Sequence, residues 1–363
     1  MNKKGIDYPI MFITLLLVCI GIVMVFSASF YYAQQKFDDS YYFFKRQSLW
    51  AIVGLFGMLF MSNFDYKKLK KFSKLLLFLS FLLLVAVLLF GTERNNAKRW
   101  LYIGPISIQP SEIAKLAIIV YLADILSVDR KRAKSFWKGI IPSILVMGIF
   151  FFLIMKQPNM STAVILAMLT FVMLFLAGAR IWHLVILVST GAIGGVALIK
   201  DATYRLKRIL AFRDPWSDPK DTGYQTIQSL YSLGSGGWFG MGLGASRQKF
   251  LYLPYSETDF IFSIIGEELG FVGATLIILL FLGLIWRGVR IAITAPDLFG
   301  TLLASGIIAM IGIQVMLNIA VVTNTIPPTG VPLPFISYGG SSLFLFMSSI
   351  GVLLNISKYS EAT

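Results

Sequence analysis

The sequence predicts an all-α fold in which about ten helices cross a membrane. Hydrophobic residues make up 57% of the 363-residue chain, charged residues only 14%, and the mean hydropathy is +0.77. A water-soluble domain of this composition would expose much apolar surface, so the solvent around most of the chain must be lipid. Apolar runs of roughly twenty residues match the ~30 Å hydrocarbon layer, and the alternation of a membrane β-barrel is missing.

Each apolar run defines one expected span, and we expect a single domain over residues 1–363. The runs cover residues 8–29, 47–64, 75–90, 110–127, 140–156, 161–178, 184–200, 259–286, 301–324 and 343–356. The first run lacks a small-residue cleavage site, so we expect it to remain as a helix. It contains the single cysteine, Cys19, and no intramolecular disulfide can form.

The distribution of basic residues predicts that both termini lie in the cytoplasm. In this orientation the cytoplasmic ends and loops carry sixteen of them, namely Lys3, Lys4, Lys67, Lys68, Lys70, Lys71, Lys74, Arg130, Lys131, Arg132, Lys134, Lys138, Arg180, Arg287, Arg290 and Lys358. The opposite short loops carry Lys36, Lys45, Arg46, Arg94, Lys98 and Arg99. The positive-inside rule favours this arrangement. The net charge of +14 is thus mostly a consequence of topology, and we expect no nucleic-acid partner.

The longest expected loop covers approximately residues 201–258, on the outer face between the seventh and eighth spans. It is rich in Gly, Pro, Asp, Arg and aromatic residues, which is typical of a functional loop. Its segment 234–249, GSGGWFGMGLGASRQK, is dense in glycine. Two interpretations remain open, because such a backbone either packs closely against protein or ligand, or forms a plain flexible loop.

Ionisable residues inside the runs cost about 2.5–3.5 kcal/mol each on insertion scales, so each needs a partner or a function. Glu112 and Lys115 are three residues apart and share one face of the fourth helix. Either they form an internal ion pair, or Lys115 binds an anionic substrate while Glu112 orients it. Glu267 and Glu268 lie deep in the eighth run, and we expect them to be structural and bonded to neighbouring helices.

Three expected helix starts face the outside, in the segments 109–115 (QPSEIAK), 156–162 (KQPNMST) and 327–342 (PPTGVPLPFISYGGSS). The unpaired N–H groups and partial positive charge of a helix start suit a phosphate group. Backbone rich in proline and glycine is tolerated at membrane depth only where protein or a water-filled cavity covers it. We therefore expect an outward-facing polar cavity, with Gln109 and Ser341 among its substrate-binding residues.

Asp259, at the start of the eighth run, is the candidate general base. Partial burial at this boundary should raise the pKa of its carboxyl. The alternative is that Thr258 and Asp259 simply cap the helix. Arg46 and Arg99 lie on the expected outer face, although most basic residues are expected on the cytoplasmic side. Either they bind an anionic partner, or their side chains reach to the membrane lipid headgroups.

The sequence lacks the residue motifs that metal-dependent, nucleotide-dependent and serine-hydrolase catalysis require. The one histidine, His183, lies in an expected cytoplasmic turn, and there is no His/Cys cluster, Walker loop or GxSxG elbow. We therefore predict no metal site and no required cofactor. A divalent cation would nevertheless assist a departing pyrophosphate.

Four long segments resemble the SEDS family of peptidoglycan glycosyltransferases, which includes FtsW, RodA and SpoVE. They are residues 94–115, 214–254, 258–273 and 327–342. The resemblance extends over nearly the whole chain, including the ten-span topology. The patterns YLPYSETDF and SRQKF are most similar to the FtsW/SpoVE branch.

This resemblance implies polymerisation of lipid II into glycan strands outside the cytoplasmic membrane, in division or sporulation, with a class B penicillin-binding protein as partner. By motif, Asp259 is then the essential carboxylate, and Glu112 and Lys115 belong to the cavity beside it. Arg46 and Arg99 match basic positions of that cavity. The chemistry agrees, since attack by a sugar hydroxyl needs a base and departing pyrophosphate needs cations or helix N-termini.

Three departures from the family pattern leave other functions open. Asn159 replaces a carboxylate in the usual QPDxGT motif, Asn96 replaces a glycine, and Glu257 stands where histidine is usual. Glu257 is two residues from Asp259 and could raise its pKa by like-charge repulsion. The alternatives are a lipid II flippase, which the lack of an obvious inverted repeat weakens, and a catalytically silent scaffold for a transpeptidase.

Overall fold

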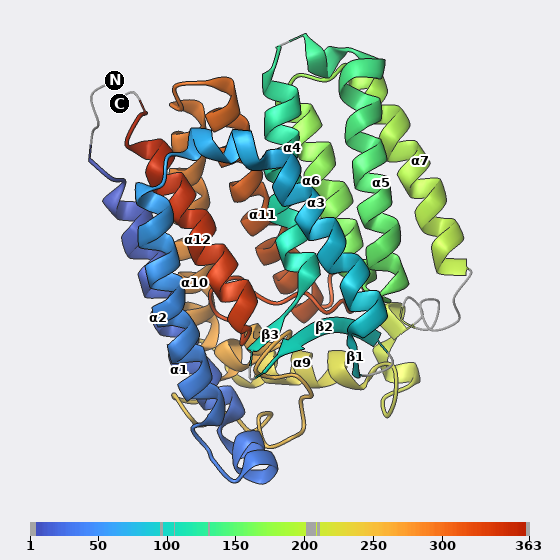
Figure 1. Ribbon diagram of the computed structural model, residues 1–363. Helices are drawn as coiled ribbons and strands as arrows, with labels where there is room; N and C mark the ends of the chain where they lie inside the picture. Colours follow the sequence, from blue (N-terminus) through green and yellow to red (C-terminus); the bar gives the residue numbers. More distant parts are fainter. Residues whose placement is uncertain are drawn as a thin grey trace.

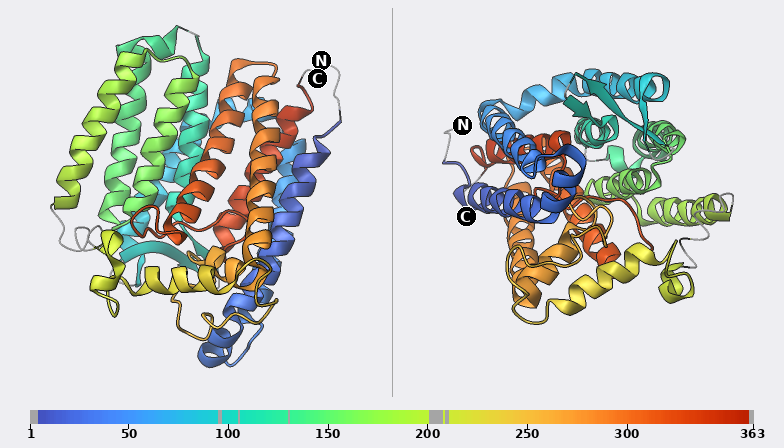
Figure 2. Two further views of the ribbon diagram at one scale, coloured as in Figure 1. Left: turned by 180° about the vertical axis from the view of Figure 1, so that it is seen from behind. Right: turned by 90° about the horizontal axis from the view of Figure 1, so that it is seen from below.

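Long helices run side by side through the computed structural model, and the chain begins and ends at the same end of the molecule (Figure 1). A helix lying crosswise and a small sheet are at the other end (Figures 1 and 2). The described residues are 5–94, 97–104, 106–129, 131–200, 208 and 211–360. Asn96, the cations Lys3, Lys4 and Arg130, and residues 201–207 and 209–210 of the predicted outer loop lie outside them.

Helices make up most of the structure. The long ones are α1 (Tyr8–Phe37), α2 (Tyr42–Asn63), α3 (Tyr66–Phe90), α4 (Pro110–Ser127), α5 (Ile141–Lys156), α6 (Met160–Leu176), α7 (Ile181–Lys200), α10 (Ile261–Ile293), α11 (Leu298–Val322) and α12 (Gly340–Ser357). Shorter segments are η1 (Arg132–Lys134), η2 (Phe136–Ile140), η3 (Pro215–Ser217) and α9 (Tyr224–Ser235). Helix α11 packs against α4, α6 and α10, while α2 packs mainly on α12.

Within the described residues, a helix overlaps each of the ten predicted apolar runs. Among the residues that the structure describes, six helices are both long and apolar enough to cross a membrane, namely α1, α3, α5 together with η2, α10, α11 and α12. Helix α4 carries three charged residues, Glu112, Lys115 and Asp124, which lower its apolar character. His183, expected in a turn, lies instead in the first turn of α7, because the helix starts three residues before the predicted run.

The all-α prediction misses a small antiparallel sheet between α3 and α4. It contains β1 (Thr92–Arg94), β2 (Ala97–Ile103) and β3 (Ile106–Ile108), in that order across the sheet. These strands are too short for their alternation to stand out from a loop. The sheet is important for the site because β2 carries Arg99.

Polar side chains cap the N-termini of several helices. At α1, Oδ1 of Asp7 accepts a hydrogen bond from the N–H of Ile10 (3.1 Å). At α11, Oδ1 of Asp297 accepts one from the N–H of Gly300 (2.8 Å). Such caps satisfy N–H groups that have no partner inside the helix.

Helix α10 is broken at Gly270, whose φ of 68° and ψ of −168° suit only glycine. The glycine-rich segment 234–249 packs into this break, where a Cβ at Gly240 would lie 2.1 Å from the carbonyl oxygen of Glu268. Close packing is therefore the correct interpretation of this segment, and a plain flexible loop is wrong. Four backbone hydrogen bonds join the two segments, from Met241 to Glu267, Gly242 to Glu268, Phe271 to Gly237 and Val272 to Trp238.

The two deep glutamates hold the same segment from inside the molecule. Ser246 Oγ donates to Glu267 Oε2 (2.6 Å). Glu268 Oε1 lies 3.1 Å from Lys249 Nζ and accepts a hydrogen bond from Ser27 Oγ of α1 (2.7 Å). Both carboxylates are almost fully buried, at 1% exposure. The prediction that they are structural is confirmed.

Candidate catalytic site

Asp259 lies in a turn that ends just before α10. The carbonyl oxygen of Tyr255 accepts hydrogen bonds from the N–H groups of Thr258 (3.1 Å) and Phe260 (3.3 Å). Helix α10 begins at Ile261, and no side chain of the described residues caps its start. The capping interpretation of Asp259 is therefore wrong, and its carboxylate is available for other chemistry.

The connection between α11 and α12 fixes the backbone of this turn. Asn318 of α11 donates two hydrogen bonds of 2.8 Å from Nδ2, one to the carbonyl oxygen of Asp259 and one to that of Val331. Ser337 Oγ donates to the carbonyl oxygen of Thr258 (2.6 Å). These bonds join residues from three separate elements, so Asp259 has a defined position.

The carboxyl group of Asp259 has a pKa raised from 3.8 to about 6. Removal of water by burial is the largest cause, and repulsion from Glu257 adds to it, while Arg99 and Arg208 act in the opposite direction. Gly330 faces the carboxylate closely, since a Cβ at this position would lie 3.0 Å from Asp259 Oδ2. A carboxyl with this pKa is largely ionised at neutral pH and can still accept a proton efficiently.

The two arginines that act on Asp259 come from distant parts of the chain. Arg99 on β2 donates from Nε to the carbonyl oxygen of Gln157 (3.2 Å) and from Nη2 to that of Pro158. Arg208 donates from Nη1 to the carbonyl oxygen of Pro328 (3.4 Å). These bonds fix the two guanidinium groups to the backbone of residues 157–158 and of Pro328.

Arg46 is linked to the turn of Asp259 indirectly, through Tyr338. Its guanidinium lies 4.6 Å from the centre of the Tyr42 ring and forms a hydrogen bond with Tyr338. Burial raises the pKa of the Tyr338 hydroxyl, and Arg46 opposes this change. The Tyr338 N–H donates to the carbonyl oxygen of Glu257 (2.9 Å). Arg46 is thus connected to the turn of Asp259 by way of Tyr338.

Glu112 and Lys115 form a second polar group between α4 and α12. Lys115 Nζ lies 2.8 Å from Glu112 Oε1, and the side chains are 1% and 6% exposed. Lys115 Nζ is also 5.8 Å from the centre of the Phe346 ring of α12. The internal ion pair is confirmed, whereas direct contact of Lys115 with a substrate stays a prediction.

Gln109 and Ser341 lie at the starts of α4 and α12, as predicted. The Gln109 side chain does not cap α4. Ser341 is 7% exposed, and within the described residues its Oγ has no hydrogen-bond partner. Ser111 Oγ, in the first turn of α4, also has no hydrogen-bond partner within the described residues. A buried hydroxyl without a partner is unfavourable, so both groups are suited to bind water or a ligand.

Asn159 caps the start of α6. Its Oδ1 accepts a hydrogen bond from the N–H of Thr162 (3.3 Å), and the residue is 5% exposed. The neighbouring Gln157 is fully buried and donates from Nε2 to the carbonyl oxygen of Leu84 (3.3 Å). An amide is therefore sufficient for the structural role at position 159.

Sequence reasoning missed three residues of the site: Arg208, Asn318 and Tyr338. Asn318 had a detectable signal, because an amide within the apolar run of α11 needs an internal partner. Arg208 had one too, as a cation on the expected outer face. Across the part of the chain that the structure describes, no three or more His, Cys, Asp or Glu side chains gather as a metal site would require.

Known proteins are similar to this chain over nearly its full length. Stage V sporulation protein E of Bacillus subtilis (strain 168) is 52% identical over 362 residues, which is 99% of each chain. The probable peptidoglycan glycosyltransferase FtsW of Geobacter sp. (strain M18) is 42% identical and covers 98% of this chain and 97% of its own.

Solved structures show the same fold. A chain of a peptidoglycan synthase complex, in which polymerization and crosslinking are coordinated, is 29% identical, with a TM-score of 0.81 over 98% of this chain and 99% of its own. The rod shape determining protein RodA of Thermus thermophilus is 28% identical, with a TM-score of 0.73 over 99% of this chain and 98% of its own.

The apolar helices and this fold define a multi-pass helical membrane protein. The family model of the cell cycle proteins FtsW, RodA and SpoVE matches residues 8–362. The chain belongs to this family, and the resemblance inferred from its motifs is confirmed.

Proposed function

We propose that this protein is a peptidoglycan glycosyltransferase that polymerises lipid II, in cell division or sporulation. The observation that carries the proposal is the setting of Asp259, a carboxylate with a pKa of about 6 under the influence of Arg99 and Arg208. The names of its FtsW relatives and its structural similarity to a peptidoglycan synthase complex support this assignment.

The geometry supports a single displacement at the anomeric carbon of one lipid-linked sugar. The 4-hydroxyl of the acceptor sugar forms the new C–O bond while Asp259 accepts the hydroxyl proton. The anomeric bond to pyrophosphate breaks, and the leaving group carries away its electron pair. Arg99 and Arg208 are placed to stabilise the negative charge that develops on the pyrophosphate. Ser341 and Gln109, at two helix starts, would bind polar groups of the substrate.

The proposed arrangement in the membrane has ten spans, with both termini in the cytoplasm and Asp259 outside. The whole chain then forms one domain in the bacterial cytoplasmic membrane. The outer loop of approximately 201–258 includes η3, α9 and the glycine-rich segment. The end of the molecule that carries α9 and the sheet would face outward (Figure 2). The excess of basic residues at the opposite end supports this orientation.

The proposed partner is a class B penicillin-binding protein, which would crosslink the new strands. Its support is the similarity to a complex that coordinates polymerization with crosslinking. The exposed aromatic residues Trp238 and Phe239, at 69% and 83%, lie on the outer glycine-rich segment and offer a surface for such contact.

The function is tested by giving purified protein labelled lipid II in proteoliposomes, alone and with the partner. We expect a ladder of glycan strands. Movement of labelled lipid II across the bilayer without polymer would instead show a flippase. Stimulation of the partner, with neither polymer nor lipid movement, would show a scaffold.

A further inference from the structure

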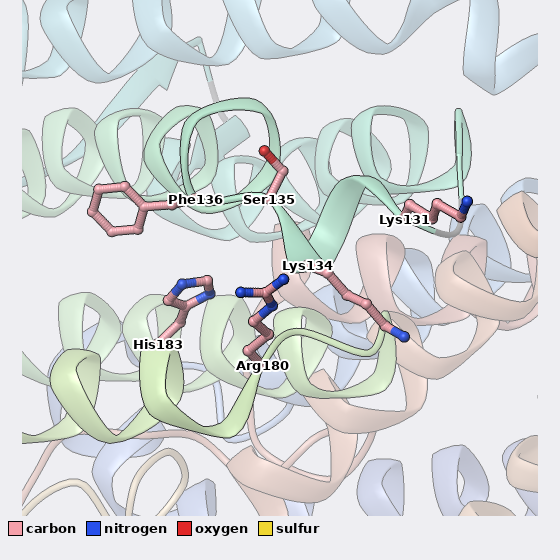
Figure 3. A pocket seen from close by; sticks show the side chains of 6 residues that line it. All are labelled: Lys131, Lys134, Ser135, Phe136, Arg180 and His183. Atoms are coloured by element: carbon pink, nitrogen blue, oxygen red, sulfur yellow. The ribbon is translucent and has the colours of Figure 1, made fainter.

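A basic pocket of about 410 Å³ lies at the end of the molecule that carries both ends of the chain, far from the proposed catalytic end. It forms where the connection between α4 and α5 meets the start of α7. Its lining residues are Lys131, Lys134, Ser135, Phe136, Arg180 and His183. Figure 3 shows Arg180 and His183 side by side, facing the segment that carries Ser135 and Phe136.

Within the described residues, the cations of the pocket have no acidic side chain paired with them. Among the described residues, no ion pair includes Lys131, Lys134 or Arg180. Asp129, the nearest acidic residue in sequence, accepts a hydrogen bond from the Lys131 N–H (3.0 Å). Nδ1 of His183 is buried and has no hydrogen-bond partner in the described part of the chain. This combination suits an anion that accepts several hydrogen bonds, such as a phosphate group.

The surroundings of the pocket indicate that it lies at the level of the lipid headgroups. The pocket lies at the start of the apolar span Phe136–Lys156. Trp137 and Trp182 are the sequence neighbours of the lining residues Phe136 and His183. They are 76% and 75% exposed, and tryptophan is enriched at the level of lipid headgroups. Further along α5 and α7, apolar side chains such as Leu145 (58%) and Ile186 (59%) remain exposed. A ligand here would meet cations, then indoles, then an apolar surface.

We infer that this pocket binds the headgroup phosphate of an anionic phospholipid, whose acyl chains lie on the exposed faces of α5 and α7. Basic pockets between membrane helices on the cytoplasmic side are known to bind anionic headgroups such as that of cardiolipin. Free phosphate would use the same cations but would gain nothing from the tryptophans or the apolar faces. The inference depends on the membrane arrangement and not on the glycosyltransferase activity.

The test is binding of phosphatidylglycerol and phosphatidylcholine to the purified protein, measured by native mass spectrometry. The Lys134→Ala/Arg180→Ala variant should bind phosphatidylglycerol at least about tenfold more weakly, equivalent to about 1.4 kcal/mol. Its binding of phosphatidylcholine should be unchanged. The matched control is Lys71→Ala/Lys74→Ala, which removes the same charge from exposed positions of α3 at the same end. This control should keep wild-type affinity.

A second variant separates lipid from free phosphate and keeps all the cations. Trp137→Ser/Trp182→Ser should bind phosphatidylglycerol at least about fivefold more weakly, and excess inorganic phosphate should not displace the lipid from the wild type. Unchanged phosphatidylglycerol binding by the Lys134/Arg180 variant would overturn the inference. Equal loss in the α3 control, or displacement by inorganic phosphate, would also overturn it.

Discussion

The pH dependence of polymerisation should reveal Asp259 as the base. With a pKa of about 6, its carboxyl is almost fully ionised near pH 8 and about one-tenth ionised near pH 5. Since the base must be ionised to accept a proton, the initial rate at saturating lipid II should fall roughly tenfold between these values. Removing the charge of Glu257 lowers the pKa, so the Glu257→Gln enzyme should keep more activity near pH 5. The shift should be less than about one pH unit, because burial is the larger cause.

Removing a nearby cation should move the profile in the opposite direction. Arg208→Gln tests this, because Arg208 lowers the pKa of the Asp259 carboxyl. The pKa of Asp259 should rise in this variant, and activity should be lost at a higher pH than in the wild type. The assay is the rate of glycan formation from labelled lipid II across this pH range. A flat wild-type profile, or a Glu257→Gln shift toward higher pH, would refute this explanation.

Three further changes test other parts of the structure. Lys115→Ala should lower the free energy of unfolding by about 3 kcal/mol, because it leaves Glu112 buried without its partner. Adding Glu112→Ala should recover part of this loss in thermal unfolding, and no recovery would argue against the ion pair. Asn159→Asp should change the polymerisation rate less than about threefold, since either residue can cap α6, and a gain of tenfold or more would show a lost catalytic carboxylate. Gly330→Ala should push the Asp259 carboxylate aside by a few tenths of an ångström and slow polymerisation roughly three- to tenfold. Gly148→Ala is its control, because an added Cβ at position 148 meets no atom within 4 Å, and equal rates in the two variants would contradict the close contact.

The helices could be predicted from sequence because hydrophobic runs of membrane length are a strong and local signal. Caps such as Asn159 could be predicted for the same reason, since the N–H that Asn159 binds is only three residues away. The sheet around Arg99 could not, because strands of three to seven residues leave little pattern. The break at Gly270 was also hidden, since it depends on pairing with a segment about thirty residues earlier in the chain.

The site itself was predictable only in part. Motif and position predicted Asp259 as the candidate base, and the raised pKa of its carboxyl follows mainly from burial. The sequence could not show that Asn318, which is 59 residues away, holds its backbone. Nor could it show that Arg208 acts on its carboxylate, because such contacts arise only when distant segments pack together. For Lys115, spacing predicted a partner, and only the structure showed that both charges are buried.

The most direct test of the central claim compares purified wild-type, Asp259→Asn and Asp221→Asn proteins with labelled lipid II and the partner transpeptidase. Asp221 is exposed and controls for the loss of one carboxylate from the proposed outer loop. Asp259→Asn should insert and unfold like the wild type but make no glycan, since only the proton-accepting group is lost, whereas Asp221→Asn should polymerise normally. Glycan strands of normal length and rate from the Asp259→Asn protein would contradict the assignment of Asp259 as the catalytic base.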